Sequence, residues 1–321
     1  MKAIIGTEYG PPESLSFEEV PMPEVADTEV LLRVHASSVN PYDWHMVRGE
    51  PYLLRMSAGY RRPKSHAMGI DAAGTVTAIG AMVTRFQPGD NVFGIAKGAF
   101  AEFAAADEKR LAVMSGGVTF ESAATLPCAG ITALQAVRDK GQVAPGMSVL
   151  INGAAGGVGS FAVQIAKSLG AEVTGVCSTR NLELVKSIGA TEVIDYSRDD
   201  FAQRSQRYDV VVDTVGNRSL GDLRRPLKPR GTLVIAGGAK GKWLRPVALL
   251  LKATLASPLV RHQLRGVMAD VTPEDLEALF NLVKTGEVVP LVDRTKPLSE
   301  LPAALAYLEE GHARGKVIIT A

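Results

Sequence analysis

The chain has 321 residues, and its 35 Lys and Arg against 34 Asp and Glu leave a formal net charge of +1. Hydrophobic residues make up 46% and charged residues 21%, which is typical of a globular protein with room for two domains. The two cysteines, Cys128 and Cys177, exclude a disulfide framework and a four-cysteine zinc cluster. We therefore expect a reducing, cytoplasmic compartment and no secretory signal.

Two stretches stand out in charge or hydropathy. Residues 223–269 contain no acidic residue while Lys and Arg accumulate there, and residues 48–64 form a second basic cluster. Such clusters can bind phosphates, nucleic acid or an anionic membrane, but most are solvated faces, so we expect no nucleic-acid partner. The apolar residues 245–261 are too few for a membrane span and are interrupted by Lys252. The wider apolar basic segment 240–265 can line a substrate entrance, form a dimer interface or lie on a membrane surface, with ordinary packing as the alternative.

The order of the predicted elements indicates two kinds of domain. The first ~125 residues are rich in short strands, such as 29–39 and 73–80, separated by Pro/Gly turns. From residue 148 strands alternate with helices, which predicts a parallel, doubly wound sheet. Its predicted strands are 148–152, 172–177, 192–196, 208–216 and 231–238, and its predicted helices are 160–170 and 182–189.

The C-terminal part departs from this alternation. Residues 272–286 predict a helix, with Thr272 as its cap, Pro273 in its first turn and an apolar stripe of Leu276, Leu279, Phe280 and Val283. Residues 316–320 predict a final strand. We expect domains at 1–128 and 129–265, with residues 266–321 returning to the first.

A glycine-rich loop, "NGAAGGVGS", follows the strand at 148–152 and precedes the helix at 160–170. Glycines allow a tight turn and let backbone N–H groups approach a pyrophosphate at the positive end of a helix. Within a strand–loop–helix–strand unit this is strong evidence for a dinucleotide site. The predicted cofactor-binding residues of the loop are Ala155, Gly156, Gly157, Val158 and Gly159.

The end of the second strand of this unit indicates which dinucleotide binds. Cys177 occupies the position where an acidic residue would hold the ribose diol, and Ser178, Thr179 and Arg180 follow it. Hydroxyls and a guanidinium suit a 2′-phosphate, whereas a carboxylate would repel it. The sequence therefore predicts NADPH rather than NADH as the cofactor.

Several motifs together resemble one family. They are the glycine loop, "ASSVNPYDW" and the segments 69–94, 123–137, 177–196 and 308–320. The sequence resembles the medium-chain dehydrogenase/reductase superfamily, in its zinc-independent quinone oxidoreductase-like branch. The resemblance implies a GroES-like β-rich catalytic domain beside a Rossmann domain, and a homodimer.

The resemblance also bears on metal binding. Zinc-dependent members would place their catalytic ligands at the positions of Asn40, Ile70 and Cys128. Of these three residues, only Cys128 is of the type that those members use as a zinc ligand. A catalytic zinc site needs three protein ligands. We therefore expect no metal.

The same resemblance suggests roles in the chemistry. Tyr42 is the candidate donor to the substrate oxygen, with a passive pocket wall as the alternative. Asn40 is expected near the nicotinamide or the substrate oxygen, with anchoring of its own turn as the alternative. Asp43 and His45 are expected to be structural. Thr132, Tyr196, Gly237, Gly238 and, with weaker support, Lys316 are expected along the cofactor.

The sequence thus predicts a metal-free, NADPH-dependent oxidoreductase that reduces quinones or α,β-unsaturated carbonyls by hydride transfer. One alternative is an alcohol or aldehyde dehydrogenase of the same superfamily. Another is a non-catalytic NADPH-binding protein with an RNA- or partner-binding role.

Overall fold

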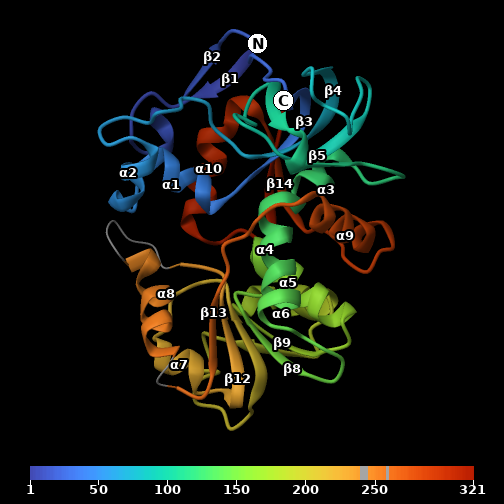
Figure 1. Cartoon of the computed structure of the whole chain (residues 1–321). Helices are drawn as coiled ribbons and strands as arrows, with labels where there is room; N and C mark the ends of the chain where they lie inside the picture. The colour runs from blue at the N-terminus through green and yellow to red at the C-terminus, as the bar shows by residue number, and fades with distance from the viewer. Residues whose placement is uncertain (239–244, 258–259) are drawn as a thin grey trace. The chain divides into compact units, whose positions relative to one another are not determined.

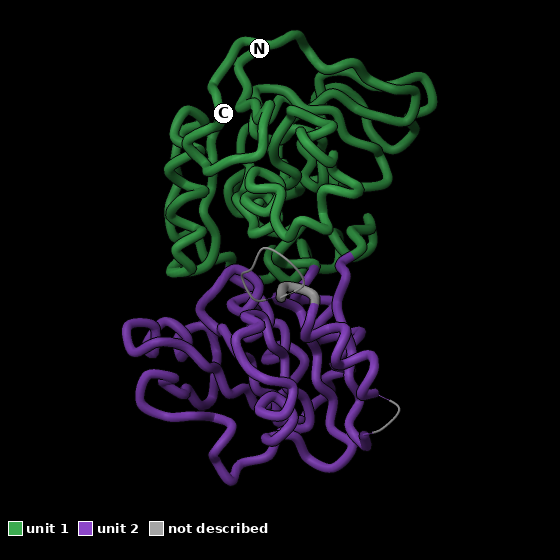
Figure 2. Tube along the Cα trace, turned by 90° about the vertical axis from the view of Figure 1, so that its left-hand side faces the viewer, with its two compact units in different colours: residues 1–131, 270–285, 290–321 green, residues 132–269, 286–289 purple. Residues whose placement is uncertain are grey.

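The computed structural model describes residues 1–238, 245–257 and 260–321. They form two compact units (Figure 2). Unit 1 consists of residues 1–131, 270–285 and 290–321, and unit 2 of residues 132–269 and 286–289. The side-chain amide of Gln164 hydrogen-bonds both the N–H and the carbonyl of Val289, which ties the short segment 286–289 to unit 2.

Unit 2 is built on a parallel sheet of six strands in the order β10-β9-β8-β11-β12-β13 (Figure 1). This is the strand order 3-2-1-4-5-6 of a Rossmann fold. The strands are β8 (Ser148–Asn152), β9 (Glu172–Cys177), β10 (Glu192–Asp195), β11 (Tyr208–Asp213), β12 (Leu227–Ile235) and β13 (Gln263–Gly266). The helices are α5 (Gly157–Ser168), α6 (Leu182–Ser187), α7 (Leu220–Arg224) and α8 (Arg245–Ala256).

The apolar runs of this region explain the sheet, because strands covered on both faces by helices are buried throughout. Leu150, Val211 and Leu233 lie in one core cluster and are fully buried. On α5, the predicted stripe residues Ala162, Ile165 and Ala166 are buried as well. The predicted doubly wound fold is confirmed.

Unit 1 contains a seven-stranded, mainly antiparallel sheet in the order β14-β15-β3-β4-β5-β7, with β6 paired to β3, and a separate β1-β2 hairpin. The first strands are β1 (Lys2–Ile5), β2 (Ser16–Glu19), β3 (Glu29–Val39), β4 (Asp71–Ile79), β5 (Asn91–Ile95), β6 (Phe103–Asp107) and β7 (Leu111–Val113). The last two strands are β14 (Val292–Pro297) and β15 (Lys316–Thr320). Its helices are α1 (Pro41–Arg48), α2 (Arg55–Ala58), α3 (Phe120–Ala124), α9 (Pro273–Lys284) and α10 (Leu301–Glu310), and α4 (Ile131–Leu134) begins at its boundary.

The C-terminal tail completes the sheet of unit 1. β15 pairs antiparallel with β3, so that Val317 lies opposite Val39, and parallel with β14. α10 packs on α1: Leu301 and Leu305 share a core cluster with Trp44 and Val47.

The structure corrects several predicted boundaries. β11 ends at Asp213 rather than at residue 216, and β10 ends at Asp195 rather than at residue 196. α6 ends at Ser187 rather than at residue 189. β12 begins at Leu227 and ends at Ile235, and α5 begins within the glycine loop, at Gly157. Among the elements that were not predicted are α1, α10, β13 and β14.

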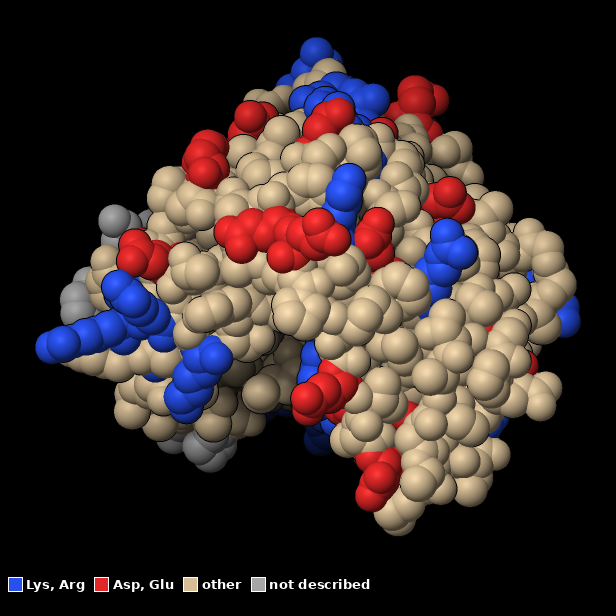
Figure 3. Space-filling model, turned by 90° about the horizontal axis from the view of Figure 1, so that it is seen from above, with Lys and Arg blue, Asp and Glu red and all other residues tan. Residues whose placement is uncertain are grey.

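The basic stretch 223–269 is partly neutralised within unit 2. Lys228 pairs with Asp209 at 2.8 Å, and Arg225 with Asp222 at 3.7 Å. On the face seen in Figure 3, acidic and basic side chains lie in small separate groups. Lys240 and Lys242 lie outside the described residues, as does the start of the apolar basic segment 240–265. Among described helices, none is long and apolar enough to span a bilayer.

Replacing Thr272 with Ala should lower the free energy of unfolding by about 1 kcal/mol. The Thr272 hydroxyl caps α9 by accepting the N–H of Asp275, and alanine leaves that N–H without this partner. Urea unfolding measures the change. Thr272→Ser keeps the hydroxyl and should stay near the wild-type value; an equal loss in both variants would show that the cap is not responsible.

Candidate functional site

The glycine loop connects β8 to α5 in unit 2, at the carboxyl edge of the parallel sheet. Gly153 has φ +86°, and a Cβ there would lie 2.4 Å from Thr214 Oγ1. A Cβ on Gly159 would lie 2.1 Å from the carbonyl oxygen of Gly153. Side chains at either position would therefore force the loop away from β11 or from the start of α5.

The predicted pyrophosphate-binding residues surround the N-terminus of α5. Gly156 is its N-cap in an extended conformation, without a side-chain cap. Gly156, Gly157 and Val158 are half-buried, whereas Ala155 and Gly159 are buried. The first N–H groups of a helix have no intrahelical acceptor and lie at its positive end. This loop therefore fits a bound pyrophosphate, and so the residues present fit a dinucleotide.

The residues predicted for the 2′-phosphate directly follow β9. Ser178 is half-buried, and Thr179 and Arg180 are exposed. The Thr179 hydroxyl donates to the Asp195 carboxylate at 2.5 Å. This carboxylate ends β10 opposite Cys177, and hydrogen bonds from Thr179 and Ser197 lower its pKa.

Asp195 was missed from the sequence, because the dinucleotide fingerprint examines the end of the second strand and Asp195 ends the third. The signal was present in "EVID", whose last residue follows two apolar, β-branched residues. Its charge lies beside the predicted 2′-phosphate residues, and it accepts the hydrogen bond of the Thr179 hydroxyl. Ser178 and Arg180 are the other two residues predicted to bind the phosphate.

The other predicted cofactor residues of unit 2 lie at the same edge of the sheet or at the unit's first residue. Tyr196 directly follows β10 and is 55% exposed. Gly237 follows β12, and a Cβ there would lie 2.1 Å from the carbonyl of Thr214. Gly238 is exposed, and Thr132, on α4, is half-buried.

A buried pair that the sequence did not predict supports this edge. Asn152 ends β8 and donates to the Asp213 carboxylate, at the end of β11, at 2.8 Å. Asp213 also accepts the N–H groups of Val215 and Gly216. These bonds hold the turn after β11, against which the glycine loop packs.

Unit 1 holds a second polar group, which we call the Lys316 cluster: Ser38, Asn40, Asp43, Asp71 and Lys316, all buried. Asn40 Nδ2 donates to Asp71 Oδ2 at 2.8 Å and to the Ser38 carbonyl at 3.2 Å. Lys316 Nζ donates to Asn40 Oδ1 and lies 3.8 Å from Asp71 Oδ2. Both amide hydrogens and the amide oxygen of Asn40 are thus engaged within the cluster.

Asp43 lies in the first turn of α1, and its Oδ2 accepts the Asn40 N–H at 2.7 Å. Its Oδ1 is buried with no hydrogen-bond partner among the described residues. Burial raises the pKa of Asp43 to about 7, opposed by the Asn40 N–H and reinforced by the charge of Asp71. Burial also raises the pKa of Asp71, and Lys316 opposes that shift.

Tyr42 is the second residue of α1 and is 44% exposed. Its hydroxyl makes no hydrogen bond to any residue that the structure describes, which leaves it able to donate to a ligand. Burial, followed by the charges of Asp43 and Cys128, raises the Tyr42 pKa above its ordinary 10. The phenol therefore stays protonated at neutral pH.

His45, also on α1, is occupied locally. Its ring stacks on Trp44 with 3.7 Å between centroids, and its Nδ1 lies 2.5 Å from the Glu50 carbonyl oxygen. Burial lowers its pKa, so the imidazole is neutral at pH 7. Asp43 and His45 therefore form no acid–base pair, and both have structural contacts.

The three positions of a catalytic zinc do not provide a donor set. The Asn40 amide is engaged within the Lys316 cluster, and Ile70 carries no donor atom. Cys128 is the one residue of the three whose side chain is a zinc-ligand type, and one ligand cannot hold a catalytic zinc. Nor does the described part of the chain contain three or more His, Cys, Asp or Glu side chains grouped to hold a metal. The residues present do not fit zinc.

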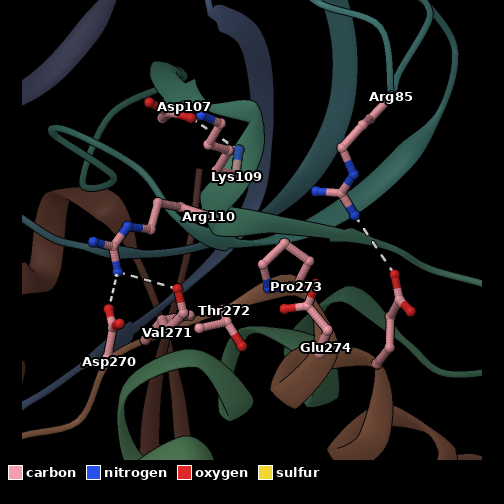
Figure 4. Close-up of a pocket in the computed structure, with 10 residues that line it drawn as sticks. Arg85, Asp107, Lys109, Arg110, Asp270, Val271, Thr272, Pro273 and Glu274 are labelled. Atoms are coloured by element: carbon pink, nitrogen blue, oxygen red, sulfur yellow. Dashed lines mark hydrogen bonds and ion pairs between the residues drawn. The ribbon is translucent and has the colours of Figure 1, made fainter.

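A polar groove of about 570 Å³ lies elsewhere in unit 1, beside the N-terminus of α9 (Figure 4). It contains none of the predicted site residues. Arg110 bonds Asp270 at 2.6 Å and the Val271 carbonyl at 3.1 Å, and Arg85 pairs with Glu277 at 3.6 Å. These contacts fasten the returning chain to unit 1, and we assign the groove no catalytic role.

Replacing Asp43 with Asn should change how the free energy of unfolding depends on pH. With a pKa of about 7 in the folded chain against 3.8 ordinarily, Asp43 binds a proton on folding between these values. This proton binding contributes fully to the free energy of unfolding below about pH 4, and its contribution is lost as the pH rises through 7. Asparagine does not titrate. The free energy of unfolding of the variant should therefore rise relative to that of the wild type by roughly 1 kcal/mol for each pH unit from pH 5 to 7.

Urea unfolding at pH 5, 6, 7 and 8 measures this difference. A difference that is constant over this range would contradict the protonated, buried state of Asp43.

Two family models match the chain. The alcohol dehydrogenase GroES-like domain matches residues 26–119, and the model described as zinc-binding dehydrogenase matches residues 188–319. The second match concerns the family, because the zinc positions of this chain carry the side chains described above.

Curated relatives and solved structures cover nearly the whole chain. The chloroplast envelope quinone oxidoreductase homolog of Arabidopsis thaliana is 35% identical over 95% of this chain and 93% of its own. The NADPH-dependent alkenal/one oxidoreductase of the same plant is 30% identical over 99% of this chain and 79% of its own. The quinone oxidoreductase structure from Coxiella burnetii matches with a TM-score of 0.87 and 32% identity, over 100% of this chain and 99% of its own. The chain belongs to the medium-chain dehydrogenase/reductase superfamily, in its quinone oxidoreductase-like branch.

Proposed function

We propose that the chain is an NADPH-dependent oxidoreductase that reduces quinones or α,β-unsaturated carbonyls without a catalytic metal. The observation that carries the proposal is the combination of a dinucleotide loop with a Tyr42 hydroxyl that has no hydrogen-bond partner among the described residues, where no group of metal-ligating side chains is found either. The names of the quinone oxidoreductase homolog and the alkenal/one oxidoreductase among the relatives support the same substrate class.

In this proposal each unit contributes a separate task. The N-terminus of α5 holds the pyrophosphate, and the residues after β9, β10 and β12 lie along the rest of the cofactor. The bound dinucleotide supplies a hydride. Reduction leaves negative charge on the substrate's carbonyl oxygen, and the Tyr42 hydroxyl stabilises that oxygen by donating a hydrogen bond. A raised pKa keeps Tyr42 a donor throughout the neutral range.

The cofactor preference for NADPH rests on Ser178 and Arg180. A guanidinium forms charge-assisted hydrogen bonds with a phosphate, and Arg180 is exposed at the start of the segment that follows β9. The Asp195 carboxylate opposes this preference, and Arg198, 3.7 Å from it, offsets part of its charge. Cytoplasmic location and a homodimer stay predictions.

Pure protein supplied with NADPH should reduce quinones or enones, and a chelator should leave the rate unchanged. Initial rates with a panel of quinones, enals, enones and alcohols, each with and without chelator, measure this. Alcohol oxidation that the chelator abolishes would favour the zinc dehydrogenase alternative. Tight NADPH binding without turnover of any panel member, together with salt-sensitive RNA binding, would favour the non-catalytic one.

Replacing Arg180 with Ala should raise the KM for NADPH by about 10-fold or more and leave the KM for NADH within about 2-fold, because only NADPH carries the 2′-phosphate. Steady-state kinetics with each cofactor measure the two values. Lys186→Ala, which removes another exposed cation of unit 2, serves as the matched control and should change neither. Equal effects of Arg180→Ala on both cofactors would refute the assignment.

A further inference from the structure

Lys316 is the one residue among the predicted cofactor contacts that belongs to unit 1 and carries a buried charge. Its side chain is only 4% exposed. A buried ammonium is costly unless other groups replace the water that it loses. Here the Val39 carbonyl at 3.0 Å, Asn40 Oδ1 and the Asp71 carboxylate at 3.8 Å surround it.

The register of three neighbouring strands explains why these groups meet. β15 pairs with β3 so that Val317 lies opposite Val39, which places Lys316 at the level of Asn40. β3 pairs with β4 so that Ser38 lies opposite Asp71. The end of β3 is thus held on one side by the first residue of β15 and on the other by the first residue of β4.

The end of β3 is also the start of α1. Asn40 is the N-cap of α1, and its N–H is accepted by Asp43 one turn later. Tyr42 is the second residue of the same helix. A shift of Asn40 therefore moves the Tyr42 hydroxyl directly, because only Pro41 lies between them.

Lys316 donates hydrogen bonds to the Val39 carbonyl and to Asn40 Oδ1, and the Asp71 carboxylate lies 3.8 Å away, within ion-pair but not hydrogen-bond distance. A cofactor phosphate would have to compete with Asp71 for the remaining N–H group of the buried ammonium. This geometry is opposed to the role along the cofactor that the sequence suggested.

We propose that Lys316 is a positioning residue, whose buried ammonium holds Asn40 and thereby sets the start of α1 and the place of the Tyr42 hydroxyl. The role of Tyr42 as donor rests on the proposed function; the hold of Lys316 on α1 does not. Asn40 acts in the same way, as the link between Lys316 and the helix, rather than by contact with substrate.

The test compares Lys316→Met, which keeps length and removes charge, with Lys316→Arg, Tyr42→Phe and the double variant Lys316→Met/Tyr42→Phe. Amide hydrogen exchange of residues 40–48 measures how firmly the start of α1 is held, and the measurement requires no enzymatic turnover. We expect exchange there to rise about 10-fold in Lys316→Met and to be partly restored in Lys316→Arg. The Kd for NADPH should stay within about 2-fold of the wild type.

Kinetics add a second readout when the wild type reduces a quinone or enone. Lys316→Met and Tyr42→Phe should each lower kcat by about 10-fold or more, and the double variant should be no slower than the slower single variant, because both remove one function. Lys296→Met, which removes a lysine paired with Glu300 on the adjacent strand β14, is the matched control and should leave kcat and exchange unchanged.

Two results would overturn the proposal: unchanged exchange at residues 40–48 in Lys316→Met, or a rise of 10-fold or more in its Kd for NADPH with kcat intact. Multiplicative losses in the double variant would also reject it. If Lys316→Met does not fold, Lys316→Met/Asp71→Asn removes the uncompensated carboxylate and should show the same exchange. Absence of turnover in the wild type would reject the proposed function alone, since the exchange experiment still decides the role of Lys316.

Discussion

One buried ammonium group, that of Lys316 on β15, contacts the end of β3, from which the candidate catalytic helix α1 begins, and the first residue of β4. Removing a charged amine from water is costly, and the cost is offset here by a carbonyl, an amide oxygen and a carboxylate that belong to β3, to the N-cap of α1 and to β4. The neighbouring Asp43 carboxyl is buried as well, and its second oxygen lacks a partner among the described residues. A cluster of this kind is specific in geometry because each group has few alternative partners. Of its members, only Asn40 stands at one of the three positions, Asn40, Ile70 and Cys128, at which the resemblance to zinc-dependent members would place a catalytic zinc ligand.

In unit 2, close backbone packing rather than a buried charge positions the candidate cofactor loop. The close approach of Gly159 to Gly153, and of Gly153 to Thr214, brings the start of α5 against the ends of β8 and β11. The helix N-terminus then presents N–H groups that no part of the helix can accept. Asn152 and Asp213 hold the adjoining turn, so the loop rests on a hydrogen-bonded support.

Long periodic segments and the glycine loop were predictable from local patterns. The helix at α9 carries its own cap and stripe, and Leu276, Leu279 and Phe280 are buried as predicted. α1 was not predicted, because its eight residues include Trp, His and Val and its stability comes from packing on α10. β13 was not predicted either, since four residues at a sheet edge have no periodicity to detect and depend on pairing with β12.

The sequence by itself determined the class of the fold and predicted the dinucleotide loop, because both depend on residue patterns at short spacing. The expectation that zinc ligands are missing at Asn40 and Ile70 came from the resemblance to the family. The sequence also drew attention to Asn40, Tyr42 and Lys316, but it assigned them separate tasks. Only the tertiary structure showed that Lys316 and Asn40 bind one another across 276 positions of sequence and that Thr179 donates to Asp195. It also showed that the Tyr42 hydroxyl has no hydrogen-bond partner in the part of the chain that the structure describes. Strand register decides which distant side chains meet, and register is set by the pairing of whole strands rather than by any local pattern.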